Sequence, residues 1–187
     1  MKRINSEQEH SLCVQPAFLI GTYNEDDTPN FCPITWVSVT YGDDGYMLVI
    51  SMNGTKKTKA NIARTGVLSA NLASTDMLPL LDYFGAHSGI DGQKTGLDFD
   101  YADGQKLHVP TLDKSRWVYE CSVVNEVQNG DTATYFCKME NVQVIEALKD
   151  ADGLWGTDLT KLEPVVYSGM YHSVGSLLGG IGDFYKP

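Results

Sequence analysis

Short runs of alternating apolar and polar residues, rich in β-branched and aromatic side chains, dominate the first half of the chain. Residues 34–39 and 67–72 alternate in this way, and residues 46–52 form a similar run. Residues 17–23 are apolar without alternation and end in a polar segment of Asn, Glu, Asp, Thr and Pro. Alternation with a period of two between turn residues is typical of β-strands. We therefore predict a strand at each of these segments, the first followed by a hairpin loop.

Two helices are predicted between these strands. Thr55 is the candidate N-cap of a helix that runs to about residue 65, and Gly66 stands where a C′ glycine commonly ends a helix. A second helix is expected from residue 74 or 75 to residue 84, with an aspartate in its first turn. Both helices are short, so they are insertions among strands rather than parts of a regular alternation of strand and helix.

The second half of the chain holds the longest alternating segments. Residues 117–127 and 132–145 flank Asn129-Gly130, a pair that favours a tight β-hairpin, and residues 165–167 form one more short strand. Residues 85–114 lack a clear pattern, which is typical of a functional loop or a disordered one. About seven strands with few short helices predict a mainly β fold, a barrel with inserted helices.

Composition and charge exclude several classes of partner. The chain carries 14 basic and 24 acidic side chains, a formal net charge of −10, and its length fits one domain, residues 1–187. A negative surface repels phosphate backbones and anionic membranes, so we expect neither nucleic acid nor a membrane as partner. No apolar stretch is long enough to span a bilayer, and the polar residues 1–9 are unlike a secretory signal, so we expect a cytoplasmic protein.

The four cysteines are widely separated along the chain. No two of them form a C-x-x-C pair, the close spacing that a zinc site normally needs, and the histidines are equally scattered. We therefore expect no metal site, and free thiols that a reducing compartment keeps reduced. Cys32, which precedes Pro33, is expected to be a small buried side chain.

The segment SMNGTKKTK, residues 51–59, is the clearest chemical signal. A strand ends, a glycine turn follows and a helix begins, and the free N–H groups at a helix start attract anions. Lysines are disfavoured at that end of a helix, yet Lys57 and two neighbouring lysines lie there. A bound phosphate would resolve the conflict, with Thr55 and Thr58 as hydroxyl donors. The alternative is a solvated basic helix start.

Two further segments offer groups for a ligand. In residues 30–36, Pro33 limits the chain to a sheet edge or a strand start, where unpaired backbone groups can bond a heteroaromatic ligand beside Thr35 and Trp36. Trp36 is equally easily a core residue. Just after the second helix, His87 could titrate near neutral pH or bind a ligand, the alternative being a solvated loop histidine.

The segment PAFLIGTYNEDDTPNFCPITW, residues 16–36, resembles the opening of the flavin reductase-like, FMN-binding split-barrel family, within which the flavoredoxin subgroup fits best. Later blocks agree in order: the strand at 48–52, KKTKANIARTGVLSANL at 56–72, YFGAHSGIDGQK at 83–94 and YSGMYHSVG at 167–175. No single block is diagnostic, but their joint order and spacing are specific. The resemblance implies a Greek-key split β-barrel, mainly β with a few short inserted helices, and a homodimer that holds FMN at its interface.

The resemblance also assigns the residues of the FMN site. The positions that match the flavin-lining and pocket positions of the family are Asn30, Pro33, Ile34, Thr35, Trp36, Ser51, Lys57, Thr58, Asn71, His87, Ser88, Gly89, Lys94 and Tyr171. Of these, Ser51, Lys57 and Thr58 match the phosphate side, in agreement with the helix start described above. No catalytic side chain is implied, because the flavin itself carries the redox chemistry.

One departure from the family concerns the strand after the main hairpin. Many relatives carry a histidine there in a D-H-x-x-F pattern, whereas this chain reads DTATYF at residues 131–136. The role of that histidine in binding flavin or pyridine nucleotide is then lost here, or shared with His87 or His172.

Two functions are compatible with these features. The resemblance implies an FMN-dependent oxidoreductase of the flavin reductase or flavoredoxin type, with NADH, NADPH or a small redox protein as electron donor. The alternative is a non-catalytic module that stores FMN, or that binds haem with His87 or His172 as axial ligand. The colour of the purified protein distinguishes them, since flavin is yellow and haem red-brown.

Overall fold

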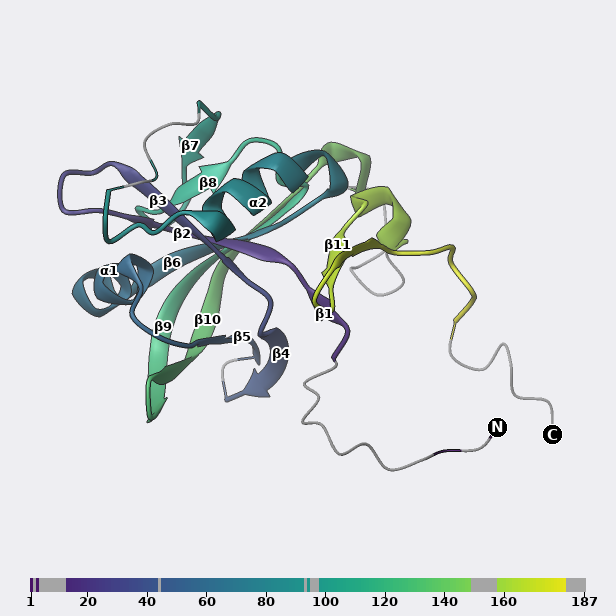
Figure 1. The fold of residues 1–187 in the computed structure, drawn as a ribbon, viewed down its shortest axis with the longest axis horizontal. Helices are drawn as coiled ribbons and strands as arrows, with labels where there is room; N and C mark the ends of the chain where they lie inside the picture. Colours follow the sequence, from purple (N-terminus) through teal and green to yellow (C-terminus); the bar gives the residue numbers. More distant parts are fainter. Residues whose placement is uncertain are drawn as a thin grey trace.

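The centre of the molecule is a seven-stranded antiparallel sheet (Figure 1). The computed structural model describes residues 1, 3, 13–43, 45–92, 94, 98–148 and 158–180. The strands follow one another across the sheet in the order β3 (Pro29–Ile34), β2 (Phe18–Tyr23), β6 (Val67–Leu72), β9 (Trp117–Asn129), β10 (Thr132–Val144), β5 (Gly45–Met52) and β4 (Val37–Gly42). The prediction of a mainly β fold is confirmed.

The two edge strands of the sheet, β3 and β4, are consecutive in the chain. Only Thr35 and Trp36 join them, so the sheet curls until its edges approach each other, which gives a barrel split along one seam. Backbone bonds fix this joint: the Val37 N–H donates to the Thr35 carbonyl and the Ser51 N–H to the Trp36 carbonyl, each at 2.9 Å. Thr35 and Trp36 therefore carry the chain from one edge of the sheet to the other.

Two of the three apolar clusters among the described residues contain most of the buried side chains of the barrel. One fills its interior and includes Phe18, Ile20 and Leu48. The other lies between the outside of β2 and β3 and the helix α2 (Leu78–Ala86), with Leu19 and Phe31 from the strands. The strand β2 is therefore buried on both faces. This explains why residues 17–23 form a continuous apolar run rather than an alternating one.

Smaller elements surround the barrel. A three-stranded sheet is formed by β1 (Gln15–Pro16), β11 (Val165–Tyr167) and β12 (Tyr171–Ser173), and a hairpin by β7 (Tyr101–Asp103) and β8 (Pro110–Leu112). Three 3-10 turns are η1 (Thr75–Met77), η2 (Glu146–Leu148) and η3 (Leu159–Leu162). The hairpin β7–β8 lies in the stretch 85–114, for which the sequence pattern predicted no element. None of the helices in the described ranges is long and apolar enough to cross a membrane.

Three predicted boundaries are wrong. The helix α1 (Lys57–Thr65) has Lys56, not Thr55, as its N-cap. The strand expected at 34–39 is two strands, because the seam interrupts it and β3 begins at Pro29. The turn of the β9–β10 hairpin consists of Gly130 and Asp131, one position later than predicted, and Gly130 takes the positive φ of 55°.

Other predictions are confirmed. The strand β6 has the predicted bounds, and Gly66 ends α1 in the left-handed conformation with φ 70° and its N–H 2.8 Å from the Ile62 carbonyl. Pro33 lies on β3, an edge strand, where its missing N–H interrupts no ladder. The second helix follows its 3-10 turn over nearly the expected residues.

Candidate functional site

Two cavities meet beside the seam. The first, the lysine cavity, has a volume of about 370 Å³ and is lined by Asn30, Cys32, Pro33, Thr55, Lys56, Lys57, Thr58, Phe84, Gly85, Ala86, His87, Ser88, Gly89, Ile90 and Lys94. The second, the tyrosine groove, has about 460 Å³ and is lined by Ala17, Pro33, Thr35, Leu81, Asp82, Gly85, Ala86, Tyr167 and Tyr171. Because Pro33, Gly85 and Ala86 border both, the two form one elongated depression with different chemistry at its two ends.

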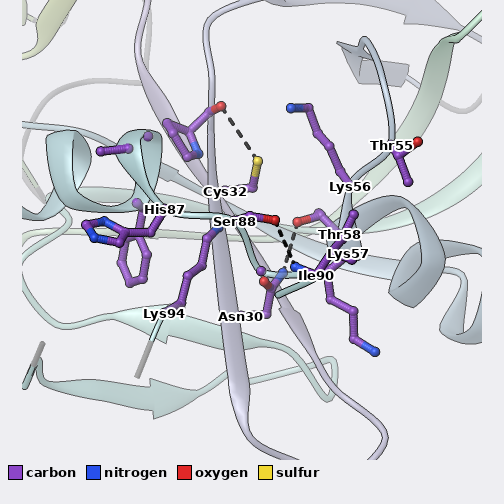
Figure 2. Close-up of a pocket in the computed structure, with 15 residues that line it drawn as sticks. Asn30, Cys32, Thr55, Lys56, Lys57, Thr58, His87, Ser88, Ile90 and Lys94 are labelled. Carbon is purple, nitrogen blue, oxygen red and sulfur yellow. Dashed lines mark hydrogen bonds between the residues drawn. The ribbon is translucent and has the colours of Figure 1, made fainter. Parts of the chain in front are cut away.

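The start of α1 forms one wall of the lysine cavity (Figure 2). Its N-cap, Lys56, makes no side-chain capping bond, and the first turn holds no acidic residue. The N–H groups of this turn therefore carry uncompensated positive potential, to which Lys56 and Lys57 add their charges. Such a helix start binds anions through its backbone and its dipole together. The conflict that the sequence predicted between lysines and helix dipole is present in the structure.

A buried hydrogen-bond network lies under this helix start. Thr58 and Asn61, on the inner face of α1, are each only 1% exposed. The Asn30 side-chain amide donates to Thr58 Oγ1 at 2.9 Å and to Thr22 Oγ1 at 3.2 Å. The Asn61 amide donates to the same Thr22 oxygen at 3.1 Å and to Asn24 Oδ1 at 3.0 Å. These bonds attach α1 to the β2–β3 hairpin and fix its N-terminus beside the cavity.

Lys94 brings positive charge to the cavity from a different part of the chain. Its Nζ donates to the Phe31 carbonyl at 2.6 Å and lies 5.5 Å from the centre of the Phe84 ring. Burial lowers the pKa of this lysine below its ordinary value, and the neighbouring Cys32 opposes that shift. A partly buried cation gains more from an anionic ligand than a fully solvated one does.

The chain after α2 closes the cavity opposite α1. His87 caps the helix, with its Nδ1 2.8 Å from the Tyr83 carbonyl and its ring 4.3 Å from the Tyr83 ring. Ser88 accepts the Ile90 N–H at 3.2 Å. A Cβ on Gly89 would lie 2.8 Å from Asn30 Oδ1, so only glycine lets the backbone pass this close.

The tyrosine groove has a different character. Its wall includes Thr35 from the seam and the rings of Tyr167 and Tyr171, whose centres are 5.6 Å apart. The Tyr171 hydroxyl donates to Asp82 Oδ1 at 3.4 Å, and its pKa is raised, first by burial and then by the charge of Asp82. Flat apolar surface with a few hydrogen-bonding groups suits an aromatic ring system.

The structure brings most of the expected site residues together, but not all. Those at the lysine cavity are Asn30, Pro33, Lys57, Thr58, His87, Ser88, Gly89 and Lys94. Pro33, Thr35 and Tyr171 lie at the tyrosine groove. The expected residues that line neither cavity are Ile34, Trp36, Ser51 and Asn71.

These four residues have other surroundings. Asn71 is 0% exposed, and its amide bonds the Leu19 carbonyl and Ser69 Oγ, so it belongs to the barrel and we leave it out of the candidate site. Ile34 is buried in the barrel core. Ser51 pairs with Thr134 across the sheet at 2.8 Å. Trp36 is 48% exposed, so it is not the core residue that we considered as the alternative.

Several cavity residues were not predicted from the sequence. Phe84, Gly85 and Ala86 at the end of α2 line the lysine cavity, and Asp82 and Tyr167 line the tyrosine groove. Apart from the order of the matching blocks, the only signal for them is their position beside a loop, since loops often carry binding residues. Apolar helix residues such as Phe84 give no such signal, because their pattern is also that of core positions.

The arrangement suits one kind of ligand. A molecule with an anionic end can place it at the α1 start between Lys56, Lys57 and Lys94, and an aromatic body can extend past Pro33 toward the tyrosines. Within the described ranges, no group of three or more His, Cys, Asp or Glu side chains could hold a metal ion. The groups that line the two cavities can hold and orient a ligand with these two ends.

Comparisons with known proteins agree with this description. Flavoredoxin of Desulfovibrio vulgaris (Miyazaki F) is 22% identical, and the match covers 97% of this chain and 99% of that one with a TM-score of 0.85. Flavoredoxin from Methanosarcina acetivorans is 23% identical, with 98% and 97% covered and a TM-score of 0.83. An FMN-binding protein from Thermus thermophilus with bound p-hydroxybenzaldehyde is 18% identical, with 96% and 97% covered and a TM-score of 0.76.

These likenesses show the fold. A structure from Shewanella frigidimarina is described as having a split barrel domain. It is 19% identical, with 89% of this chain and 85% of that one covered and a TM-score of 0.76. No curated protein sequence matches the chain. Residues 10–175, however, match the family model described as flavin reductase like domain. The chain therefore belongs to the flavin reductase-like family.

Proposed function

We propose that this chain is an FMN-binding flavoprotein of the flavin reductase or flavoredoxin type, formed by residues 1–187 as one domain. The observation that carries the proposal is the uncapped start of α1, which faces the lysine cavity with no acidic residue in its first turn. That cavity continues into an aromatic groove. The order of groups matches FMN, in which a phosphate is joined through a short chain to a flat ring system.

The residues present fit the two ends of FMN. Lys57, Thr58 and the N–H groups of the first turn would hold the phosphate, and Lys94 would balance charge from the opposite wall. Backbone groups at Pro33 and the hydroxyl of Thr35 would meet the ring system at the seam. Bound FMN would supply the redox chemistry, while these residues bind it, orient it and limit the access of water.

FMN rather than FAD is favoured by the distribution of charge. The basic groups of the depression gather at the α1 end, whereas the other end carries the carboxylate of Asp82. FAD would need a second phosphate site and room for an adenosine beyond it. Extraction of the cofactor from purified protein, followed by chromatography, tests this. A yellow protein that releases mainly FMN supports the proposal, and one that releases mainly FAD, haem or nothing contradicts it.

We further propose that the protein is a homodimer. The lysine cavity and the tyrosine groove are open depressions, and exposed apolar side chains continue from the seam along β4 and β5 as Trp36, Val39, Tyr41 and Tyr46. A second copy placed there would cover a flat cofactor and bring Trp36 close to it. Exposed apolar side chains gathered in this way are typical of protein interfaces.

The electron donor is proposed to be NADH, NADPH or a small redox protein, so the protein would act as an oxidoreductase or an electron carrier. Anaerobic mixing with NADH and with NADPH distinguishes these. Bleaching of the flavin absorbance within seconds supports a reductase. Absence of bleaching, with reduction by a reduced iron–sulfur protein instead, supports a carrier. Unpaired cysteines in the described residues agree with the reducing cytoplasm that we propose as its location.

A further inference from the structure

The hydrogen bonds around Asn30 have a direction that bears on ligand selectivity. A primary amide has two N–H donors, and those of Asn30 go to Thr22 Oγ1 and Thr58 Oγ1. Both bonds are buried, with Asn30 5% exposed and Thr22 and Thr58 1% exposed. The Thr58 oxygen is therefore an acceptor in this contact.

A hydroxyl group has one hydrogen to donate. Because Thr58 Oγ1 accepts from Asn30, that hydrogen must be donated elsewhere, and Thr58 and Asn30 both line the lysine cavity (Figure 2). We propose that Asn30 is a positioning residue, which turns the Thr58 hydroxyl so that it donates to an anionic oxygen at the start of α1. The inference rests on the proposed function, in which that oxygen belongs to the FMN phosphate.

The rest of the network supports this role. Thr22 Oγ1 receives the amides of both Asn30 and Asn61, so the Asn30 side chain is held from β2 while it contacts α1. On its other side, Asn30 Oδ1 faces Gly89, where there is no room for a Cβ. Asn30 is thus fixed between the hairpin, the helix and the loop after α2. A donor that is already fixed in its binding orientation loses less conformational entropy when it binds an anion.

A double-mutant cycle tests the inference. The proteins are the wild type, Asn30→Ala, Thr58→Val and the double variant, and the readout is the ratio of FMN affinity to riboflavin affinity from fluorescence titrations. Riboflavin lacks the phosphate, so a general loss of folding lowers both affinities and leaves the ratio unchanged. Each single variant is expected to lower the ratio about tenfold or more, the size of one hydrogen bond to a charged group.

The double variant decides between positioning and independent action. If Asn30 acts through the Thr58 hydroxyl, Asn30→Ala lowers the ratio no further in the Thr58→Val protein. The inference would be overturned if the losses in the two single variants added up fully in the double variant. It would also be overturned if Asn30→Ala had the same FMN-to-riboflavin affinity ratio as the wild type. The matched control is Thr65→Val, which removes a hydroxyl hydrogen bond at the far end of α1, away from both cavities, and should keep the ratio.

Asn30→Asp provides a second test with the shape of the side chain retained. The carboxylate cannot donate to Thr58 and instead accepts its hydrogen, so the ratio should fall further than in Asn30→Ala. A ratio at or above that of Asn30→Ala would contradict the inference. If wild-type protein binds FMN no better than riboflavin, the phosphate assignment of the proposed function fails, and this outcome is distinct from failure of the positioning role.

Discussion

The carboxylate of Glu120 on β9 accepts the side-chain amide of Asn141 on β10 at 2.7 Å, although Glu120 is 0% exposed. The same carboxylate accepts the backbone N–H groups of Lys106 and Leu107 at 2.8 and 2.7 Å. Burial alone would raise the pKa of Glu120, but these hydrogen bonds outweigh it, so its pKa lies below the ordinary value. Glu120 thus connects the β7–β8 hairpin to the barrel through its negative charge.

We predict that Glu120→Gln destabilises the protein by about 1–3 kcal/mol near neutral pH, because a neutral amide leaves buried donors unpaired. The depressed pKa of Glu120 contributes stability that is present above the unfolded value of about 4.5 and is lost as the pH falls through the folded value. The difference between wild type and variant should therefore shrink in acid. Urea unfolding near pH 7 and about pH 4 measures it.

The matched control is Glu140→Gln, because Glu140 is more exposed and bonds Ser122, Lys138 and Lys106 at the surface. Its loss should cost less than about 1 kcal/mol. Equal costs for the two variants, or a Glu120→Gln cost that does not depend on pH, would refute the buried-carboxylate explanation.

The thiols should differ in reactivity. Cys13 is exposed, whereas Cys121 and Cys137 are buried in the barrel, and burial raises the pKa of Cys137 to about 12 and that of Cys121 well above its ordinary value. We expect iodoacetamide at mildly alkaline pH to label Cys13 first and the two barrel thiols only after unfolding. Mass spectrometry of the labelled peptides checks this order, and early labelling of Cys121 or Cys137 would contradict it.

Cys32 offers a probe of the cavity itself. It lines the lysine cavity and is 7% exposed, so it should react slowly in the folded protein. In a Cys13→Ser variant, saturating FMN should slow this labelling several-fold relative to flavin-free protein. Riboflavin at equal occupancy serves as the comparison. Labelling of Cys32 that is unaffected by FMN would mean that the cofactor does not occupy this cavity.

Gly89→Ala should weaken FMN binding without unfolding the barrel. Its new Cβ would lie 2.8 Å from Asn30 Oδ1 and 3.3 Å from Lys57 Cβ, so the loop after α2 must move away from α1. We expect a loss of about tenfold in FMN affinity, since small displacements of binding groups are costly. Gly175→Ala is the control, because a Cβ there meets no atom within 4 Å. Fluorescence titration measures the FMN affinity, and circular dichroism checks that each variant is folded. Equal FMN affinities for the two variants would contradict the prediction.

The proposed dimer makes a prediction about the exposed face at β4. Tyr41 and Tyr46 pair across β4 and β5 with their rings 5.2 Å apart, edge to face, next to the exposed Val39. Val39→Glu should shift the protein toward monomer in light scattering at low micromolar concentration, because a charge is costly to bury. Leu159→Glu, on the exposed η3, should leave the mass unchanged. A wild-type monomer that retains FMN would remove the basis for the dimer.

The sequence was informative where local chemistry decides the structure. Gly66 needs its positive φ, and β6 is bounded by this glycine, so both were predictable. The interruption at Thr35 and Trp36 was not, because residues 34–39 alternate as one strand and only the closure of the barrel forces a break. Tertiary pairing overrides local preference in such places.

The residues of the candidate site also fall into those that the sequence could predict and those that it could not. The lysines at the start of α1 stand out against the helix dipole, so a basic helix start could be predicted from residues 51–59, and the structure places it beside a cavity. Asn71 could not be separated from the true cavity residues, because a buried asparagine in a barrel network and one facing a ligand have the same sequence pattern. The role of Asn30 as donor to Thr58 depends on contacts between residues far apart in the chain.

The proposed function depends on the phosphate of FMN binding at the start of α1. The most direct measurement is a fluorescence titration of FMN and of riboflavin with wild type and with a Lys57→Ala, Thr58→Ala double variant, and with Lys106→Ala, an exposed lysine outside both cavities, as control. We expect the double variant to lose about tenfold to a hundredfold in FMN affinity, to keep its riboflavin affinity and to remain folded. Equal losses for the two ligands, or none for either, would contradict this expectation.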